Sequence, residues 1–175
     1  MNQSAEAPER AHKKKSAGRA LLGLIVKLAM VAAIVWAALT FVFGVFRLSG
    51  NNMYPALKDG DLCITYRLDN YLSDDVVAYR VDGKVRFGRI IAKSGDTVDG
   101  DEQGVLVNNN YRSEEIFYPT DMLNIQLTLP VTLTEGQYMV LNDYREDLSD
   151  SRTYGAIDEG DLEGKVIFIF RRRGF

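Results

Sequence analysis

The hydrophobic and polar positions divide the chain near residue 46. Residues 20–46 form an apolar run of 27 positions whose only charge is Lys27, and residues 28–46 carry no charge at all. As a helix at ~1.5 Å per residue, those last 19 residues would span roughly 29 Å, which matches a bilayer core of roughly 30 Å. The pattern therefore predicts a transmembrane anchor at residues 20–46.

Beyond residue 46 the helical spacing stops, and short segments rich in β-branched and aromatic residues follow. Turn clusters separate these segments, and Asp82-Gly83 between two of them is typical of a two-residue hairpin. The expected strands are residues 62–67, 76–81, 84–91, 105–107, 125–133, 137–141 and 165–172. The predicted fold is mostly β, with antiparallel β-sheets preceded by one N-terminal transmembrane helix.

Charge is distributed unevenly on the two sides of the apolar run. Residues 1–19 carry five Lys and Arg against two Glu, whereas residues 47–175 carry 15 Lys and Arg against 22 Asp and Glu. By the positive-inside rule, the basic tail stays in the cytoplasm. We therefore predict a basic cytoplasmic tail (1–19), the anchor (20–46) and an extracytoplasmic domain (47–175), in a single-pass protein of the cell membrane. The acidic outer domain argues against a nucleic-acid partner.

A cleaved secretory signal peptide is the alternative explanation of the same N-terminal pattern. Signal peptides also begin with basic residues, but their apolar core is usually about 7–15 residues long. The run here is longer, and Phe41, Phe43 and Phe46 stand where a cleavage site would need small residues. The pattern favours an anchor.

The scarcity of two residue types limits the chemistry of the outer domain. The only histidine is His12, in the basic tail, and the only cysteine is Cys63. Catalysis by Ser-His-Asp or Cys-His, and metal sites built from histidine or clustered cysteine, are therefore excluded for residues 47–175. Any hydrolytic chemistry there would have to work without histidine.

Three blocks of the outer domain carry the motifs. The first follows the apolar run directly and reads Gly50-Asn51-Asn52-Met53-Tyr54-Pro55-Ala56-Leu57-Lys58-Asp59-Gly60-Asp61. The second is Arg89-Ile90-Ile91-Ala92-Lys93-Ser94-Gly95-Asp96, and the third runs from Asn142-Asp143-Tyr144-Arg145 to Asp150-Ser151-Arg152. In this order they resemble the signatures of the type I signal peptidases, membrane-tethered serine proteases that remove signal peptides at the outer membrane surface. The resemblance covers essentially the whole outer domain and implies β-sheets of the signal peptidase type.

The sequence departs from the family at its catalytic positions. The family uses a Ser–Lys dyad, in which a desolvated lysine with a lowered pKa takes the serine proton. Asn52 stands at the serine position, Gly88 at the lysine position, and Leu148 at the position of a serine that orients the lysine. A carboxamide has no hydroxyl to deprotonate, and glycine has no side chain. We therefore predict that the chain is not an enzyme and that it has no catalytic residue, no cofactor and no metal site.

The resemblance also implies roles for the remaining residues of these blocks. The family binds its substrate as an extended strand beside the strands around the dyad. The candidates for this peptide groove are Gly50, Asn52, Met53, Arg86 and Gly88, and Gly88 is expected to widen it. The residues expected to give structural support are Arg89, Asp150, Ser151 and Arg152, with Asp150 and Arg152 as an ion pair.

The degenerate dyad resembles a subgroup of the family. Non-catalytic signal-peptidase-like proteins occur beside pilus genes in Gram-positive bacteria, where they assist sortase-driven pilin polymerisation. This resemblance implies a chaperone-like factor at the cell surface, held in the membrane by residues 20–46. Its expected partners are exported protein or pilin segments, together with the sortase machinery.

Two alternatives stay open at this point. An active signal peptidase could use a relocated nucleophile such as Ser49, with Lys84 or Lys93 as the base. Ser49 and Lys93 lie at odd offsets from the dyad positions, which in an extended chain turns their side chains to the opposite face. In the other alternative the domain is structural and holds partner proteins through its exposed surface, for example around residues 108–122.

Overall fold

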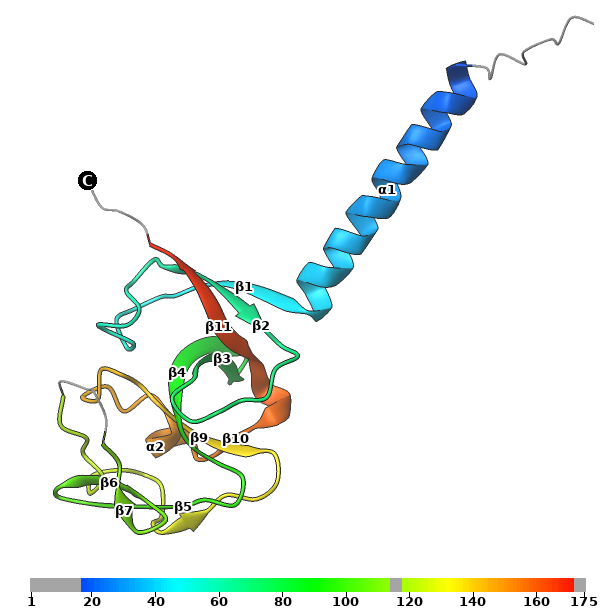
Figure 1. Ribbon diagram of the computed structural model, residues 1–175. Helices are drawn as coiled ribbons and strands as arrows, with labels where there is room; N and C mark the ends of the chain where they lie inside the picture. The colour runs from blue at the N-terminus through cyan, green and yellow to red at the C-terminus, as the bar shows by residue number, and fades with distance from the viewer. Residues whose placement is uncertain (1–16, 114–117, 172–175) are drawn as a thin grey trace, which may run out of the picture. The chain divides into compact units, whose positions relative to one another are not determined.

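The computed structural model describes residues 17–113 and 118–171 (Figure 1). The chain forms two compact units, one up to Ala37 and one from Ala38 onward, and each is described by itself. The first unit contains most of helix α1 (Ala17–Phe41). From Gly18 to Phe41 this helix is long and apolar enough to cross a membrane, and its most apolar window is not buried. The helix therefore fits a membrane anchor.

The helix ends earlier than the apolar run does. The sequence predicted an anchor at residues 20–46, but α1 stops at Phe41 and strand β1 (Phe43–Arg47) follows. Residues of β1 pair with β2 (Leu62–Tyr66), from Phe43 opposite Tyr66 to Arg47 opposite Leu62. Aromatic and β-branched residues suit both a bilayer and a strand, so hydropathy alone does not locate this boundary.

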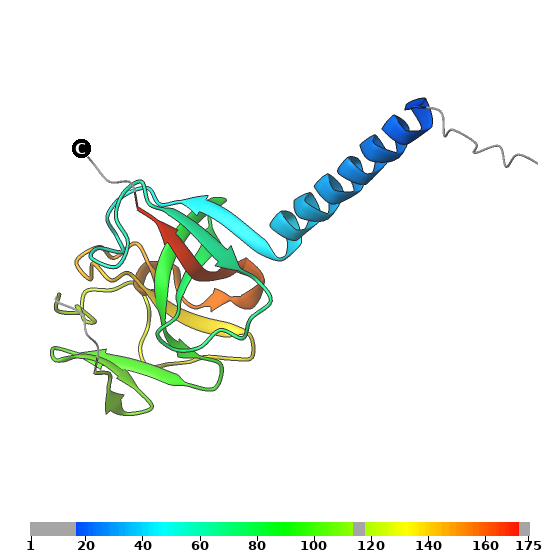
Figure 2. The same ribbon diagram turned by 45° about the horizontal axis from the view of Figure 1, so that its top comes forward.

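Seven strands among the described residues form one sheet in the order β1-β2-β11-β3-β4-β9-β10, and all their pairings are antiparallel. The strands not yet given are β3 (Val76–Val81), β4 (Lys84–Lys93), β9 (Gln137–Leu141), β10 (Ile157–Asp158) and β11 (Leu162–Phe170). Figure 2 shows β1, β2 and β11 running side by side at one edge of this sheet. The predicted mostly β, antiparallel fold class is confirmed.

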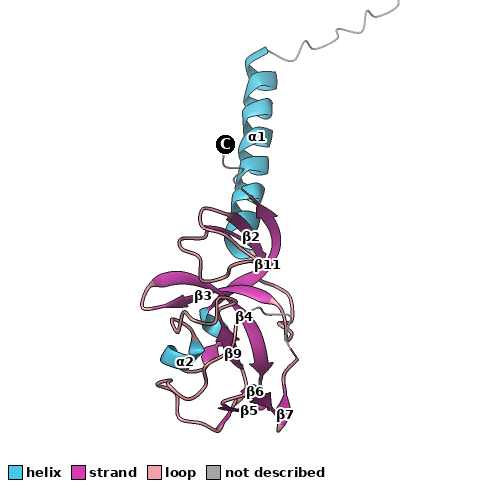
Figure 3. Ribbon diagram, turned by 90° about the vertical axis from the view of Figure 1, so that its left-hand side faces the viewer, coloured by secondary structure: helices cyan, strands magenta, loops and turns pink. Residues whose placement is uncertain are grey.

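A smaller antiparallel sheet has the order β7-β6-β5-β8. Its strands are β5 (Thr97–Asp101), β6 (Gly104–Val107), β7 (Asn110–Tyr111) and β8 (Val131–Thr132). In Figure 3, β5, β6 and β7 lie at the end of the domain opposite to β2 and β11. Two short helical turns complete the described secondary structure, α2 (Ser151–Tyr154) and the 3₁₀ turn η1 (Glu159–Asp161).

One apolar cluster fixes the loop between β1 and β2 to the large sheet. Met53 and Leu57 of this loop pack with Phe87 of β4 and Ala78 of β3. All four side chains are 1% exposed or less. Because burial of such a side chain contributes about 1.5–3 kcal/mol, the loop that carries Asn52 is held firmly against β4.

The local patterns located some elements better than others. The Asp82-Gly83 hairpin is confirmed, since β3 and β4 pair up to Val81 opposite Lys84 and both turn residues have positive φ. The strand expected at residues 125–133 is wrong for most of its length, because only β8 forms there. Pro130 has no N–H to give to a ladder. The amides of Gln126 and Leu127 instead donate to the Arg152 carbonyl.

Candidate functional site

The loop between β1 and β2 is closed at its base by main-chain hydrogen bonds. The Leu48 amide donates to the Asp61 carbonyl (2.8 Å), and the Gly60 amide donates to the Leu48 carbonyl (3.0 Å). Gly50 has φ +94°, a conformation that favours glycine, and its amide donates to the Asp59 carboxylate (2.8 Å). The loop therefore presents Asn52 from a defined backbone.

The Asn52 carboxamide joins three segments of the domain. Its Nδ2 donates to the Phe87 carbonyl of β4 (3.0 Å) and to Oδ1 of Asn142, which follows β9 (2.9 Å). The main-chain carbonyl of Asn52 accepts a further hydrogen bond from the main-chain amide of Tyr144 (2.9 Å). Since the Phe87 carbonyl can only accept, the amide nitrogen must face it. The Asn52 carboxamide thus ties the β1–β2 loop to β4 and to the chain after β9.

The space beside Gly88 is filled by its neighbours. A Cβ atom built on Gly88 would lie 2.4 Å from Cγ1 of Val140 and 3.2 Å from Cε1 of Tyr79. The expectation that Gly88 widens a groove is therefore wrong. The side chains of Val140 from β9 and Tyr79 from β3 fill the space that a side chain at Gly88 would occupy. A lysine at this position would require these two side chains to move.

Tyr79 and Arg86 lie next to Gly88 on the paired strands β3 and β4. Tyr79 is fully buried, and its hydroxyl has no hydrogen-bond partner among the described residues. Burial raises the pKa of this hydroxyl, and the nearby Asp150 carboxylate raises it further. Tyr79 is therefore protonated and cannot act as a base near neutral pH. The Arg86 guanidinium lies over the Tyr154 ring, 4.9 Å from its centroid, in a cation–π contact.

Asp150 and Arg152 form a fully buried ion pair that organises the chain after β9. Arg152 Nη2 lies 2.7 Å from Asp150 Oδ2, and both side chains are 0% exposed. The other donors of the Arg152 guanidinium bind the carbonyls of Arg145 and Asp147 (2.8 Å each). Ser151 Oγ accepts from the Val140 amide of β9 (3.0 Å). Leu148 lies inside the segment that these bonds hold in place.

Arg89 makes a second ion pair in the same region. Its guanidinium binds Asp143 through two parallel hydrogen bonds, Nε to Oδ1 (2.8 Å) and Nη2 to Oδ2 (2.7 Å). This bidentate geometry is the strong form of an arginine–carboxylate contact. It connects β4, one residue beyond Gly88, to the residue that follows Asn142.

The structure does not gather the candidates for a relocated dyad around Asn52. Ser49 and Lys84 are exposed, Lys84 at the β3–β4 hairpin, and Lys93 is exposed at the other end of β4. Within the described residues, no hydrogen bond joins Ser49 to either lysine. Met53, one of the groove candidates, is completely buried in the core rather than open to a ligand.

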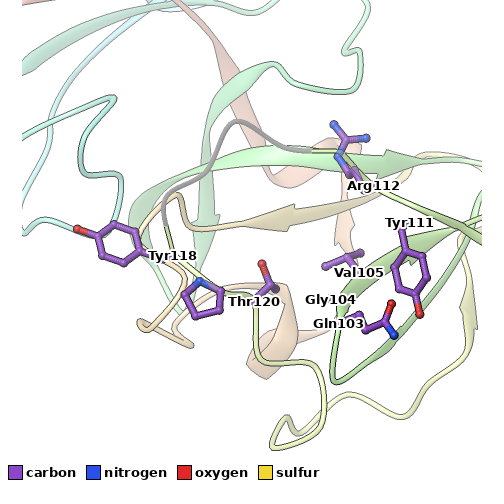
Figure 4. A pocket seen from close by; sticks show the side chains of 8 residues that line it. Gln103, Gly104, Val105, Tyr111, Arg112, Tyr118 and Thr120 are labelled. Carbon is purple, nitrogen blue, oxygen red and sulfur yellow. The ribbon is translucent and has the colours of Figure 1, made fainter.

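Sequence reasoning missed two cavities. One of about 290 Å³ lies beside Asn52 and is lined by Asn51, Tyr54, Lys58, Tyr118 and Tyr144. The second, of about 260 Å³, is shown in Figure 4, where Tyr118 stands opposite Tyr111 and Gln103. Tyr118 lines both. Tyr118 is far in sequence from the other walls of the first cavity, so a local pattern gives no sign of it.

The family model and the curated relatives agree on one family. Residues 21–171 match the family model described as signal peptidase, peptidase S26. Signal peptidase IB of Staphylococcus aureus strain Mu50 is 28% identical over 171 residues, covering 86% of this chain and 89% of that protein. Signal peptidase I of Bacillus licheniformis is 31% identical over 158 residues, covering 81% and 85%. A solved signal peptidase I from Enterococcus faecalis V583 has a TM-score of 0.49 and 23% identity, and covers 57% of this chain and 98% of that chain.

The fold and the site together define an antiparallel β domain that follows an apolar helix suited to anchor it in a membrane. Its β1–β2 loop, β4 and the chain after β9 meet at the position of Asn52. The match over residues 21–171 and the relative at 31% identity identify the larger class, and the chain belongs to the signal peptidase, peptidase S26, family.

This membership corrects one prediction. The sequence led us to predict that the chain is not an enzyme, but the relatives are named as signal peptidases, which are enzymes, and the family model is that of a peptidase. The prediction was wrong because it inferred the absence of enzymatic activity from the side chains of Asn52, Gly88 and Leu148 alone. Side chains at three aligned positions do not outweigh a match that extends over almost the whole chain.

Replacing Asn52 should test its role as a connection between segments. Asn52→Ala removes two hydrogen bonds and should lower the free energy of unfolding by about 1–3 kcal/mol. Asn52→Asp should cost more near neutral pH, because a carboxylate would face the oxygens of Phe87 and Asn142. Its pKa would be raised in the folded state, so the loss should shrink as the pH falls below that value, when the protonated acid can donate. Urea unfolding of the full-length protein in detergent micelles measures both effects.

Asn70→Ala is the matched control, because Asn70 is exposed and its side chain makes no hydrogen bond among the described residues. This control should change the unfolding midpoint by less than about 0.5 kcal/mol. Equal stability of Asn52→Ala and Asn70→Ala would contradict a connecting role for Asn52.

Adding one carbon at Gly88 should test the packing beside it. Gly88→Ala should destabilise the domain by about 1–3 kcal/mol, because the new methyl group overlaps Val140. Val140→Ala should recover part of this loss when it is combined with Gly88→Ala. Gly160→Ala is the control, since nothing lies within 4 Å of a Cβ at that position. A Gly88→Ala protein as stable as the Gly160→Ala protein would show that the space is open after all.

Proposed function

We propose that this protein binds exported polypeptides as extended segments at the outer face of the membrane, and that pilin segments are among them during pilus assembly. In this proposal residues 1–19 stay in the cytoplasm, the apolar helix crosses the membrane once, and the β domain lies outside. The apolar helix and the basic tail support this orientation.

The observation that carries the proposal is an open edge of β4 beside Asn52. Strand β4 pairs with β3 from Lys84 to Arg89, but its pairing with β9 begins only at Arg89, opposite Leu141. Among the described strands, residues 84–88 of β4 therefore have a partner on one side only. An unpaired strand edge can accept an extended segment through main-chain hydrogen bonds.

The Asn52 amide limits how a segment can add at this edge. It already occupies the Phe87 carbonyl (3.0 Å), and main-chain groups alternate between the two edges of a strand, so a bound segment would use the main-chain groups of Val85 or displace this amide. The cavity of about 290 Å³ beside Asn52 offers a place for a side chain of such a segment.

The pilin part of the proposal has a different support. It comes from the resemblance of the residues at positions 52 and 88 to the subgroup found beside pilus genes. Under this proposal the domain holds a pilin segment in an extended form near the membrane and presents it to the sortase machinery. Such a factor would act as a chaperone for the exported chain.

Cleavage of exported precursors is a second candidate function, favoured by the names of the relatives as signal peptidases. It would require a hydroxyl other than the family's serine, because Asn52 has none. Incubating the full-length protein in detergent micelles with a signal-peptide substrate, followed by mass spectrometry, tests it. Turnover that is lost in Ser49→Ala or Lys84→Ala would support this candidate, and intact substrate would contradict it.

Site-specific photo-crosslinking tests the binding proposal. A photoreactive side chain at Asn51, beside the open edge, should crosslink to an exported precursor or a pilin in membranes that contain the full-length protein. The same group at Gln103, an exposed residue in the turn between β5 and β6, is the control and should give less than about a tenth of that yield. Crosslinks from Gln103 alone would contradict the open-edge site and favour docking through the smaller sheet.

Deleting the gene in the host separates the pilin part from the binding part. Loss of polymerised pili, restored by the full-length protein, would support the role in pilus assembly. Unchanged pili together with crosslinks from Asn51 would leave polypeptide binding in place and refute the pilin assignment.

A further inference from the structure

The cavity beside Asn52 is built from two parts of the chain that flank the site and from one distant segment. Asn51, Tyr54 and Lys58 come from the β1–β2 loop, and Tyr144 comes from the chain after β9. The loop is folded by bonds from the Tyr54 amide to the Asn51 carbonyl (3.0 Å) and from the Leu57 amide to the Met53 carbonyl (2.9 Å). Tyr118 closes the cavity from a third segment.

Three tyrosine rings form the walls of this cavity. The rings of Tyr118 and Tyr144 meet edge to face, with centroids 4.8 Å apart and planes at 85°. The Tyr144 hydroxyl donates to Glu146 (2.6 Å), which fixes that ring and raises the pKa of its hydroxyl. Tyr54 keeps 42% of its surface exposed. The walls are therefore aromatic and largely preset before anything binds.

Lys58 supplies a positive charge at the edge of the cavity. Its Nζ lies 5.6 Å from the centroid of the Tyr54 ring. The side chain is exposed, and no ion pair is formed by Lys58 within residues 17–113 and 118–171. Since its ammonium has no carboxylate partner, it can attract one from a ligand.

We propose that this cavity binds an aromatic side chain of an extended exported polypeptide, and that Lys58 selects a carboxylate on the neighbouring residue. A volume of about 290 Å³ lies near the lower end of the range for ligand pockets, which suits one large side chain. A fourth ring among Tyr54, Tyr118 and Tyr144 gains edge and face contacts that an aliphatic chain does not. This inference rests on the proposed function, because it names the side chain that the bound segment presents.

Matched peptides test the inference on the full-length protein in detergent micelles. The probe is a fluorescein-labelled, extended Ser-Gly-Thr peptide that carries one Phe-Asp pair, and its partners replace Phe by Ala or Asp by Asn. Fluorescence anisotropy should show that replacing Phe by Ala weakens binding about 10-fold, through lost aromatic burial. Replacing Asp by Asn should weaken it about 3-fold at low salt and less at high salt.

Variants of the cavity assign these preferences to its walls. Tyr118→Ala should reduce the difference between the Phe and Ala peptides to within about 2-fold, because the ring that contacts Phe is gone. Lys58→Glu should remove the preference for Asp over Asn while keeping the preference for Phe. Tyr111→Ala and Lys93→Glu change the same residue types outside this cavity and should preserve both preferences.

The possible failures are distinguishable. If the Phe-Asp and Ala-Asp peptides bind equally well, or if Tyr118→Ala keeps the full preference for Phe, the aromatic pocket is refuted while polypeptide binding stands. If no peptide binds and Asn51 gives no crosslinks to exported chains, the proposed function fails together with the inference.

Discussion

The buried ion pair of Asp150 and Arg152 is the interaction on which the site depends. Both side chains are completely buried, so neither charge is solvated by water. Removing one partner of such a pair typically costs about 3–5 kcal/mol, because the other charge is left without compensation. The same two side chains also form hydrogen bonds with main-chain groups between β9 and α2. The pair therefore stabilises the conformation of the chain after β9, which contacts Asn52.

A short series of contacts leads from the ion pair to the site. Asp150 Oδ2 accepts from the Asn142 amide (2.9 Å), and Oδ1 of Asn142 accepts from Asn52 (2.9 Å). The Tyr144 amide then binds the Asn52 carbonyl, which positions the Tyr144 ring as a wall of the cavity. Asn52 is thus part of a hydrogen-bond network that extends to the buried ion pair. In the same network, Gly88 leaves room for Val140 and Tyr79 to pack.

The sequence located the elements whose signals are local. Strands β3 and β9 have the expected bounds, and the Asp82-Gly83 turn lies where its two residues indicated. The three motif blocks indicated the family, because their glycines, turn residues and charged residues stand at the spacings and in the order of the family signatures. Strand β1 was not predicted, since its residues continue the apolar run and look like the end of an anchor.

The features that depend on distant segments could not be predicted. Gly88 has no side chain, so the sequence suggested free space, but Val140 from β9 fills it. No local pattern marks Tyr118, and only the fold brings its ring against Tyr144. The chemistry was misjudged for a related reason: we predicted from a few aligned positions, whereas the relatives match over nearly the whole chain.

Amide hydrogen exchange at Tyr144 tests the dependence of the site on the buried ion pair most directly. In the Asp150→Asn variant of the full-length protein in detergent micelles, the account predicts that Tyr144 and Asn142 exchange at least about 10-fold faster than in the unchanged protein, because local opening becomes easier. Amides of the β3–β4 hairpin should keep their rates. If Tyr144 exchanged at its original rate, the Asn52 network would be independent of the ion pair, and this account would be contradicted.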